Sequence, residues 1–166
     1  MSNNSQLSKE AYSDFQVRNL ESSPYIKPYQ ILFKQNSIQR SWHCMQSHES
    51  VSVLLHDTER DLVVLVKQFR PAVFMSNCLE VQRAKDPYKV DFAHANPEAG
   101  ITYELCSGIV DKEDKNLLEI TREEILEECG YDVPLKNIYE VNTFRAGIGI
   151  TGFVFKKLLN LKTKNA

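Results

Sequence analysis

The segment GIVDKEDKNLLEITREEILEECGY, residues 108–131, predicts the fold more clearly than any other part of the chain. Its part from Asn116 to Cys129 contains neither Gly nor Pro, is rich in Leu, Ile and Glu, and is followed by Gly130. A run without helix-breaking residues that stops at a glycine is typical of a helix with a glycine C-terminal stop. We therefore predict a helix over residues 116–129.

The predicted helix has an apolar and an acidic face. At ~100° per residue, Leu118, Ile125 and Cys129 fall on one side, with Leu126 beside them. The other side carries Glu123, Glu124, Glu127 and Glu128. Carboxylates stabilise the first turn of a helix and cations the last, each by roughly 0.3–1 kcal/mol. Glutamates gathered in the last two turns therefore indicate a positively charged partner.

A hard divalent cation suits these carboxylates. Glu124, Glu127 and Glu128 have the spacing i, i+3, i+4, which presents three carboxylates to one point. Mg²⁺ takes oxygen ligands and is usually held by a few carboxylates together with substrate phosphates. The alternative is a solvated, glutamate-rich surface, which is the commoner explanation of such a string in isolation.

In its context the segment resembles the Nudix box of the Nudix hydrolases, roughly Gly-x5-Glu-x7-Arg-Glu-hydrophobic-x-Glu-Glu-x-Gly-hydrophobic. The matching residues are Gly108, Glu124, Ile125, Glu127, Glu128, Gly130 and Tyr131. The loop is one residue longer than in the family, so Asp114 falls at the place of the loop acid. Glu123 stands where the family has an arginine that orients a ligand carboxylate, and Arg122 lies one position earlier.

The resemblance extends from about residue 24 to residue 152 and favours the UDP-sugar diphosphatase branch, close to the ADP-ribose pyrophosphatases. It is carried by SWHCMQSHESVSVLLHD, LVVLVKQFRPAVF, TYELCSGIVD, EECGY and GIGITG. It implies an α/β fold, the Nudix α/β/α sandwich with a mixed sheet, and a homodimer formed through an N-terminal β region at about residues 24–48. It also implies hydrolysis of UDP-glucose to UMP and glucose 1-phosphate with Mg²⁺ or Mn²⁺, and ADP-ribose as a second candidate substrate.

The resemblance, together with the chemistry of the individual residues, gives the candidate site residues. The metal ligands are Glu124, Glu127, Glu128 and a backbone carbonyl at or near Gly108, and Glu127 and Glu128 are the candidate catalytic residues. The candidate substrate contacts are Arg70, Glu104, Gly147 and Gly149. A guanidinium fork suits a phosphate, and glycines allow backbone to approach a ligand. A solvated arginine, a strand-face carboxylate and an ordinary glycine turn are the alternatives for these contacts.

Local patterns predict the remaining elements. Strands are expected over residues 29–35 and 38–46, joined at Asn36-Ser37 as a hairpin, and over 50–57 and 61–69 as core strands. Pro71 should end the last of these. Residues 75–100 are expected to be a long loop, 101–107 and 137–145 strands, and 146–152 a glycine-rich loop.

The predicted domain organisation is a flexible segment at 1–23, a Nudix domain at 24–152 and a divergent, lysine-rich tail at 153–166. The family normally continues with further strands and a terminal helix, so we expect a chain that lacks C-terminal elements. An alternative function follows from this expectation, namely a catalytically weak or inactive Nudix-fold protein that binds a nucleotide sugar or a full-length subunit.

The composition excludes some partners. With 166 residues, 42% of them hydrophobic, the chain is long enough for one domain with its own core. A net charge of −2 gives no basis for binding nucleic acid or an anionic membrane. The scattered cysteines predict free thiols, no apolar run is long enough to span a membrane, and the polar start is unlike a signal peptide. We expect a cytoplasmic protein.

Overall fold

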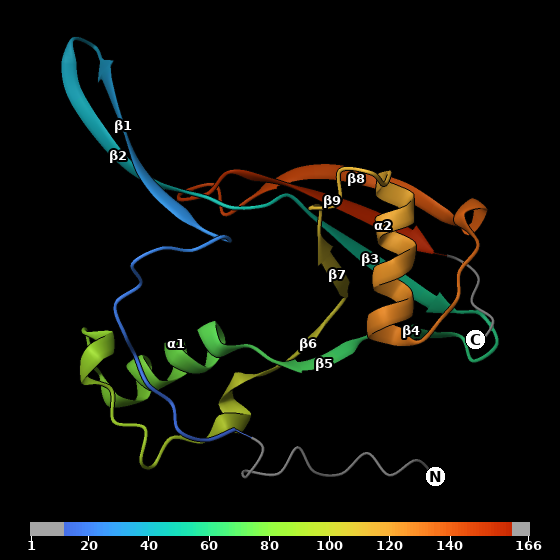
Figure 1. Cartoon of the computed structure of the whole chain (residues 1–166), viewed down its shortest axis with the longest axis horizontal. Coiled ribbons are helices and arrows are strands. Elements are labelled where there is room, and N and C mark those ends of the chain that lie inside the picture. Colours follow the sequence, from blue (N-terminus) through green and yellow to red (C-terminus); the bar gives the residue numbers. More distant parts are fainter. Residues whose placement is uncertain (1–11, 161–166) are drawn as a thin grey trace. The chain divides into compact units, whose positions relative to one another are not determined.

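Figure 1 shows a computed structural model of the chain, in which residues 12–160 are described. Contacts divide the chain into two compact units. Residues 12–20 and 67–103 are called the helical unit here, and residues 21–66 and 104–160 the sheet unit.

The sheet unit is built around strand β3 (Ser50–Asp57), whose bounds agree with the prediction. The sheet has the order β4-β3-β9-β8, and β7 also pairs with β3. β9 (Phe153–Asn160) runs parallel to β3 and antiparallel to β8 (Ile138–Ala146). β4 (Leu62–Val64) and β7 (Cys106–Ile109) pair antiparallel with opposite ends of β3.

One helix packs against this sheet and closes its core (Figure 1). It begins as α2 (Leu117–Glu124) and continues as the π-helical turn η4 (Ile125–Cys129), and a short 3-10 helix, η5 (Leu135–Asn137), precedes β8. The buried cluster consists of Val51, Val53, Leu55, Cys106, Ile125, Tyr131, Val133, Ile138 and Leu158.

The predicted hairpin is confirmed as β1 (Lys27–Gln35) and β2 (Ile38–Gln46). Asn36 and Ser37 have φ of 49° and 64°, as expected of a two-residue turn in which both central residues have positive φ. The Trp42 Nε1–H donates to the carbonyl of Gly149 at 2.8 Å, and the Met45 N–H donates to Ile150 at 2.9 Å. These bonds join the hairpin to the glycine-rich loop.

The helical unit contains α1 (Pro71–Gln82), two 3-10 helices, η2 (Pro87–Lys89) and η3 (Pro97–Gly100), and a two-stranded sheet. The sheet consists of β5 (Val66–Phe69) and β6 (Ile101–Glu104), and all of its residues except Val66 and Glu104 belong to the helical unit. Phe74, Cys78 and Val90 form the buried centre of the unit.

Three predictions for this region are wrong. Residues 75–100 are not a long loop, since α1 occupies the segment up to Gln82. Pro71 ends the preceding strand as predicted, but it is also an N-terminal residue of α1, a position where its missing N–H costs nothing. The predicted strand 61–69 is divided into β4 and β5, and β5 pairs with β6 instead of extending the main sheet. The predicted strand 101–107 is likewise divided, at Leu105.

The two ends of the described chain also differ from expectation. Residues 153–160 are not a divergent tail but the central strand β9, with Leu158 fully buried. The adjacent Lys156 and Lys157 obscure the alternation from which strands are predicted. At the other end, Phe15 lies 4.3 Å from Phe74 and Tyr12 stacks on Phe69 at 4.2 Å, so residues 12–20 have packed aromatic side chains. Residues 1–11 of the predicted flexible segment and 161–166 of the predicted tail lie outside the described residues.

We predict that Gly100→Ala destabilises the helical unit. An added Cβ would lie 2.4 Å from Phe69 Cε2 and 2.7 Å from Phe74 Cβ, and overpacking of this kind costs about 1–3 kcal/mol. Urea unfolding measures the loss. Gly149→Ala is the matched control, because a Cβ there meets nothing within 4 Å. Equal stability of the two variants would contradict the packing described for Gly100.

Candidate functional site

The helix that carries the glutamates is confirmed, and its two ends explain its bounds. The Asn116 side chain accepts the N–H of Glu119, and the Glu119 carboxylate accepts the N–H of Asn116, which forms a capping box. Gly130 ends the helix with φ of 74°, in the left-handed region that favours glycine. The final turn is π-helical, so the predicted α-helical spacing of the glutamates is not kept. Such turns are frequent at functional sites.

The packing face of the helix differs in part from the prediction. Ile125 is fully buried, and Leu118 and Cys129 are partly buried against the same core. The most buried residues on α2 are Ile120 and Thr121, and Thr121 satisfies its hydroxyl by donating to the carbonyl of Leu117 at 2.7 Å. Neither residue was predicted on the packing face of the helix. For Thr121 the reason is that a threonine within a charged run does not indicate a core position.

Gly108 lies in strand β7, opposite Val51 of β3. The Glu124 side chain lies directly against it, since a Cβ at residue 108 would stand 2.1 Å from Glu124 Cδ. A side chain at residue 108 would therefore displace the Glu124 carboxyl from this place. The strand and the helix are both anchored in the core, so this contact fixes where the Glu124 carboxyl lies.

Electrostatics set Glu124 apart from the other glutamates. Partial burial is the main cause that raises the pKa of its carboxyl, and the neighbouring charges of Glu127 and Glu128 raise it further. Asp111 acts in the same direction, whereas the ammonium group of Lys112 opposes it. A negative charge at Glu124 is therefore disfavoured in the protein, and a cation at this place would relieve it.

Glu128 is connected to the same strand. Its Oε2 accepts the backbone N–H of Ser107 at 3.0 Å, so Glu124 and Glu128 meet neighbouring residues of β7. Next to them, the Cys106 thiol lies in hydrogen-bond contact with Cys129, which raises the pKa of Cys106 and lowers that of Cys129. All four cysteines are free thiols, as predicted.

The carboxylate oxygens of Glu124, Glu127 and Glu128 are the kind of ligand that binds a hard divalent cation, but these side chains are not gathered into a complete metal site. Within residues 12–160, no three His, Cys, Asp or Glu side chains stand close enough together to hold a metal ion. Glu127 and Glu128 are exposed. What fits the cation is the space that Gly108 leaves for the Glu124 carboxyl and the mutual repulsion of Glu124, Glu127 and Glu128. Carboxylate oxygens are also the ligands that Mg²⁺ prefers.

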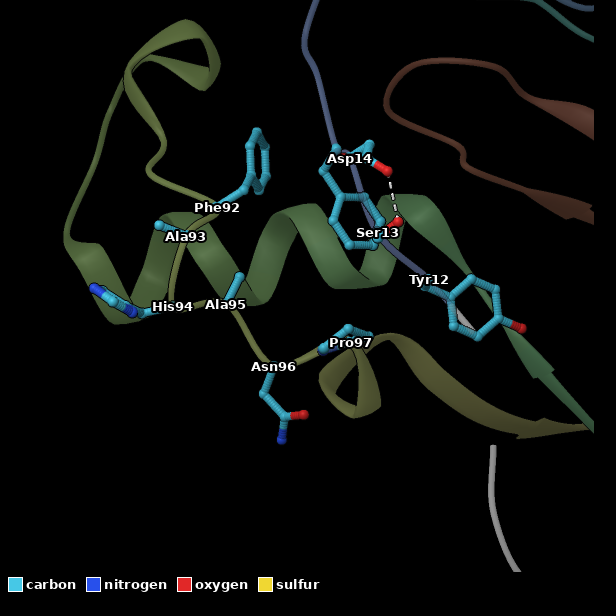
Figure 2. A pocket seen from close by; sticks show the side chains of 10 residues that line it. Tyr12, Ser13, Asp14, Phe92, Ala93, His94, Ala95, Asn96 and Pro97 are labelled. Atoms are coloured by element: carbon cyan, nitrogen blue, oxygen red, sulfur yellow. Dashed lines mark hydrogen bonds between the residues drawn. The ribbon is translucent and has the colours of Figure 1, made fainter. Parts of the chain in front are cut away.

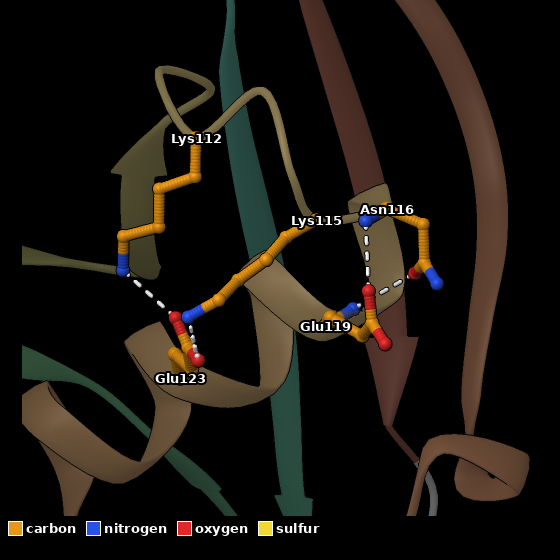
Figure 3. A network of polar contacts seen from close by, with 5 residues as sticks. All are labelled: Lys112, Lys115, Asn116, Glu119 and Glu123. Atoms are coloured by element: carbon orange, nitrogen blue, oxygen red, sulfur yellow. Dashed lines mark hydrogen bonds and ion pairs between the residues drawn. The ribbon is translucent and has the colours of Figure 1, made fainter.

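Two lysines that were not predicted contact this region from the loop before α2. Figure 3 shows Lys112 and Lys115 pointing at the Glu123 carboxylate, at 2.8 and 2.5 Å. Hydrogen bonds from these ammonium groups hold the pKa of Glu123 at about 2. Arg122 pairs instead with Asp132, at 2.6 Å. The sequence does show two lysines close together in the loop before the helix, but a charged loop does not reveal which side chain its lysines contact.

The predicted substrate contacts come from several elements. Arg70 lies in the helical unit at the N-cap of α1, and its backbone N–H donates to Gly100 at 2.8 Å. Glu104 is the last residue of β6 and is partly buried. Gly147 has φ of 56°, and its carbonyl accepts the N–H groups of residues 150–152, so this glycine closes a tight turn. Gly149 accepts the hydrogen bond from Trp42.

The helical unit carries a hollow of about 550 Å³ (Figure 2). Tyr12, Phe15 and Phe92 contribute aromatic rings to its lining, and Asp14 and Asn96 contribute polar groups. None of the predicted site residues lines it.

Comparisons with known proteins agree with the resemblance found in the sequence. No family model matches the chain. It is 37% identical over 140 residues to uridine diphosphate glucose pyrophosphatase NUDT14 of Bos taurus, covering 79% of this chain and 62% of that protein. The Mus musculus protein of the same name is 37% identical over 138 residues, covering 78% and 61%. The chain thus spans about three fifths of the length of these relatives.

A solved structure with a similar fold is described as the crystal structure of ADP compounds hydrolase. It matches with a TM-score of 0.61 and 10% sequence identity, over 89% of this chain and 65% of that one. The predicted α/β fold class is therefore confirmed. In the part of the chain that the structure describes, none of the helices has the length and apolar character needed to cross a membrane.

We predict that Glu124→Gln raises the melting temperature of the metal-free protein at pH 7. The pKa of Glu124 is higher in the folded than in the unfolded protein. Its ionised carboxylate therefore destabilises the folded state at a pH above the folded-state pKa. This destabilisation disappears below the unfolded-state pKa of about 4.3, where the carboxyl is protonated in both states. Scanning calorimetry with a chelator present should show a rise of a few degrees that disappears near pH 4. Glu113→Gln, an exposed change in the preceding loop, is the control. A fall at pH 7 would show that Glu124 serves the stability of the fold.

Proposed function

Because the chain belongs to the Nudix hydrolase family, we propose that it hydrolyses the diphosphate bond of nucleoside diphosphate sugars. UDP-glucose is the first candidate substrate, giving UMP and glucose 1-phosphate, and ADP-ribose is the second. The observation that supports this proposal best is the Glu124 carboxyl lying against Gly108, with Glu127 and Glu128 beside it.

Glu124, Glu127, Glu128 and a backbone carbonyl at or near Gly108 are the proposed ligands of Mg²⁺, for which Mn²⁺ could substitute. When bound, the cation would neutralise phosphoryl oxygens and lower the pKa of a water molecule. The chain contributes the positions of the oxygen donors. Ser107 holds one oxygen of Glu128 through its N–H, and β7 and the helix hold Glu124, while the exposed Glu127 is accessible from solvent.

Hydrolysis of a diphosphate depends mainly on positioning the water and stabilising charge on the phosphoryl oxygens. Among the substrate contacts, Arg70 is proposed for a phosphate, since its guanidinium can form two parallel hydrogen bonds. Glu104 and the backbone of Gly147 and Gly149 are proposed to contact the remainder of the substrate.

The proposed assembly is a homodimer that uses the β1–β2 hairpin. Several large apolar side chains on both strands are exposed, including Ile31, Leu32, Phe33, Ile38 and Trp42, at 41–65%. A surface of this kind is typical of an interaction site. A cytoplasmic location is proposed from the free thiols, which suit a reducing compartment.

A second candidate function is binding without turnover. It is favoured by one observation, that no group of three potential ligands within residues 12–160 is gathered to hold a metal ion. A protein of this kind would bind a nucleotide sugar, or a longer subunit of the same family, and leave the diphosphate intact.

We predict that the protein releases UMP from UDP-glucose in the presence of Mg²⁺. Replacing Glu127 or Glu128 by Gln should lower kcat/KM by roughly 100-fold or more, because charge stabilisation at the reacting phosphate is lost. Glu113→Gln should keep full activity. Comparing kcat/KM on UDP-glucose and ADP-ribose identifies the preferred substrate. Thermal stabilisation by UDP-glucose without any UMP release would reject the hydrolase and favour the binding function.

We also predict that Gly108→Ala weakens Mn²⁺ binding while leaving the fold intact. The new methyl group would occupy the place of the Glu124 carboxyl, and that flexible side chain can move away without disturbing the core. Isothermal titration calorimetry should show a loss of roughly 10-fold or more in affinity, with a melting temperature within a few degrees of the parent. Unchanged affinity would remove Gly108 and Glu124 from the proposed metal site.

A further inference from the structure

The contacts of Glu123 connect the loop before α2 to the helix. Lys112 Nζ lies 2.8 Å from one oxygen of Glu123, and Lys115 Nζ lies 2.5 Å from the other (Figure 3). The three side chains are about one-third exposed, at 33–35%. Both lysines come from residues 110–116, so two bonds from one loop converge on a single carboxylate of the helix.

This cluster lies next to the proposed metal ligands. Glu123 directly precedes Glu124, and the ammonium group of Lys112 interacts electrostatically with Glu124 and Glu127 as well as with Glu123. An ammonium group that paired fully with Glu124 or Glu127 would neutralise the charge that a divalent cation needs. Each oxygen of Glu123 pairs with one of the two lysines. The carboxylates of Glu124 and Glu127 therefore stay available to a cation.

Glu123 is the helix residue on which both ion pairs from the loop meet. The neighbouring Arg122 takes no part in these two pairs, because it pairs with Asp132 on the exposed surface.

We propose that Glu123, Lys112 and Lys115 form a brace that positions the loop 110–116 against the helix and keeps the Lys112 ammonium group off Glu124 and Glu127. The three are positioning residues for the proposed hydrolysis, on which this inference rests. Partly exposed ion pairs contribute little to stability, so the brace acts on the site more than on the fold.

A charge-swap experiment tests the brace. Glu123→Lys breaks both ion pairs, and Glu113→Lys makes the same change of net charge at an exposed residue of the same loop. The double variant Lys112→Glu with Glu123→Lys restores an opposite-charge pair and the parent net charge. Mn²⁺ affinity is measured by titration calorimetry, and mobility of the loop by hydrogen exchange with a chelator present.

The brace predicts that Glu123→Lys lowers Mn²⁺ affinity by roughly 10- to 100-fold and speeds amide exchange in residues 110–116. Glu113→Lys should lose less affinity, and that loss should vanish at high salt. The double variant should recover part of both the affinity and the protection, because the pair at residue 112 is restored while Lys115 faces a like charge. Equal losses in the two single variants, or no recovery in the double variant, would overturn the brace.

The exchange measurement separates this inference from the proposed function. If the parent protein binds no Mn²⁺, the metal site and the role of the brace toward it are both rejected. If the parent binds Mn²⁺ and hydrolyses UDP-glucose while Glu123→Lys matches Glu113→Lys in affinity and exchange, the function stands and the brace alone is rejected.

Discussion

The close approach of the Glu124 side chain to Gly108 is the contact on which the candidate site depends. Gly108 is held by the pairing of β7 with β3, and Glu124 by the burial of Ile125 immediately after it. A glycine inside a strand weakens the strand and often marks a place where another group comes near. Here that group is a carboxyl, and the adjacent residue Ser107 binds a second one, Glu128. Two core elements therefore bring acidic side chains to one short stretch of strand.

The charges around this contact oppose the stability of the helix. Acidic groups at a helix C-terminus interact unfavourably with its dipole, and partial burial together with the charges of Glu127 and Glu128 raises the pKa of Glu124. Among the ion pairs described for residues 12–160, those that join a lysine to the last two helical turns all involve Glu123. A cation would relieve this repulsion, which is the physical basis of the proposed metal site.

The sequence predicted the elements that local rules specify. Helix 116–129 follows from its composition and Gly130, strand 50–57 from its Val and Leu content, and the hairpin from Asn36-Ser37. Elements that depend on distant partners were missed. Pro71 is compatible with the end of a strand and equally with the start of α1. The adjacent Lys156 and Lys157 interrupt the apolar alternation expected of β9, whose place in the sheet is set by its pairing with β3 and β8. Gly108 and Glu124 could be named from the motif, but their contact, the π-helical turn and the lysines on Glu123 required coordinates.

The most direct test of the central claim is anomalous X-ray diffraction from crystals grown with Mn²⁺. One anomalous peak is expected beside the backbone of Gly108, bound by Glu124 together with Glu127, Glu128 or both. A fully occupied Mn²⁺ at another place, or no peak at saturating Mn²⁺ while these three side chains point into solvent, would show that these glutamates do not form a metal site.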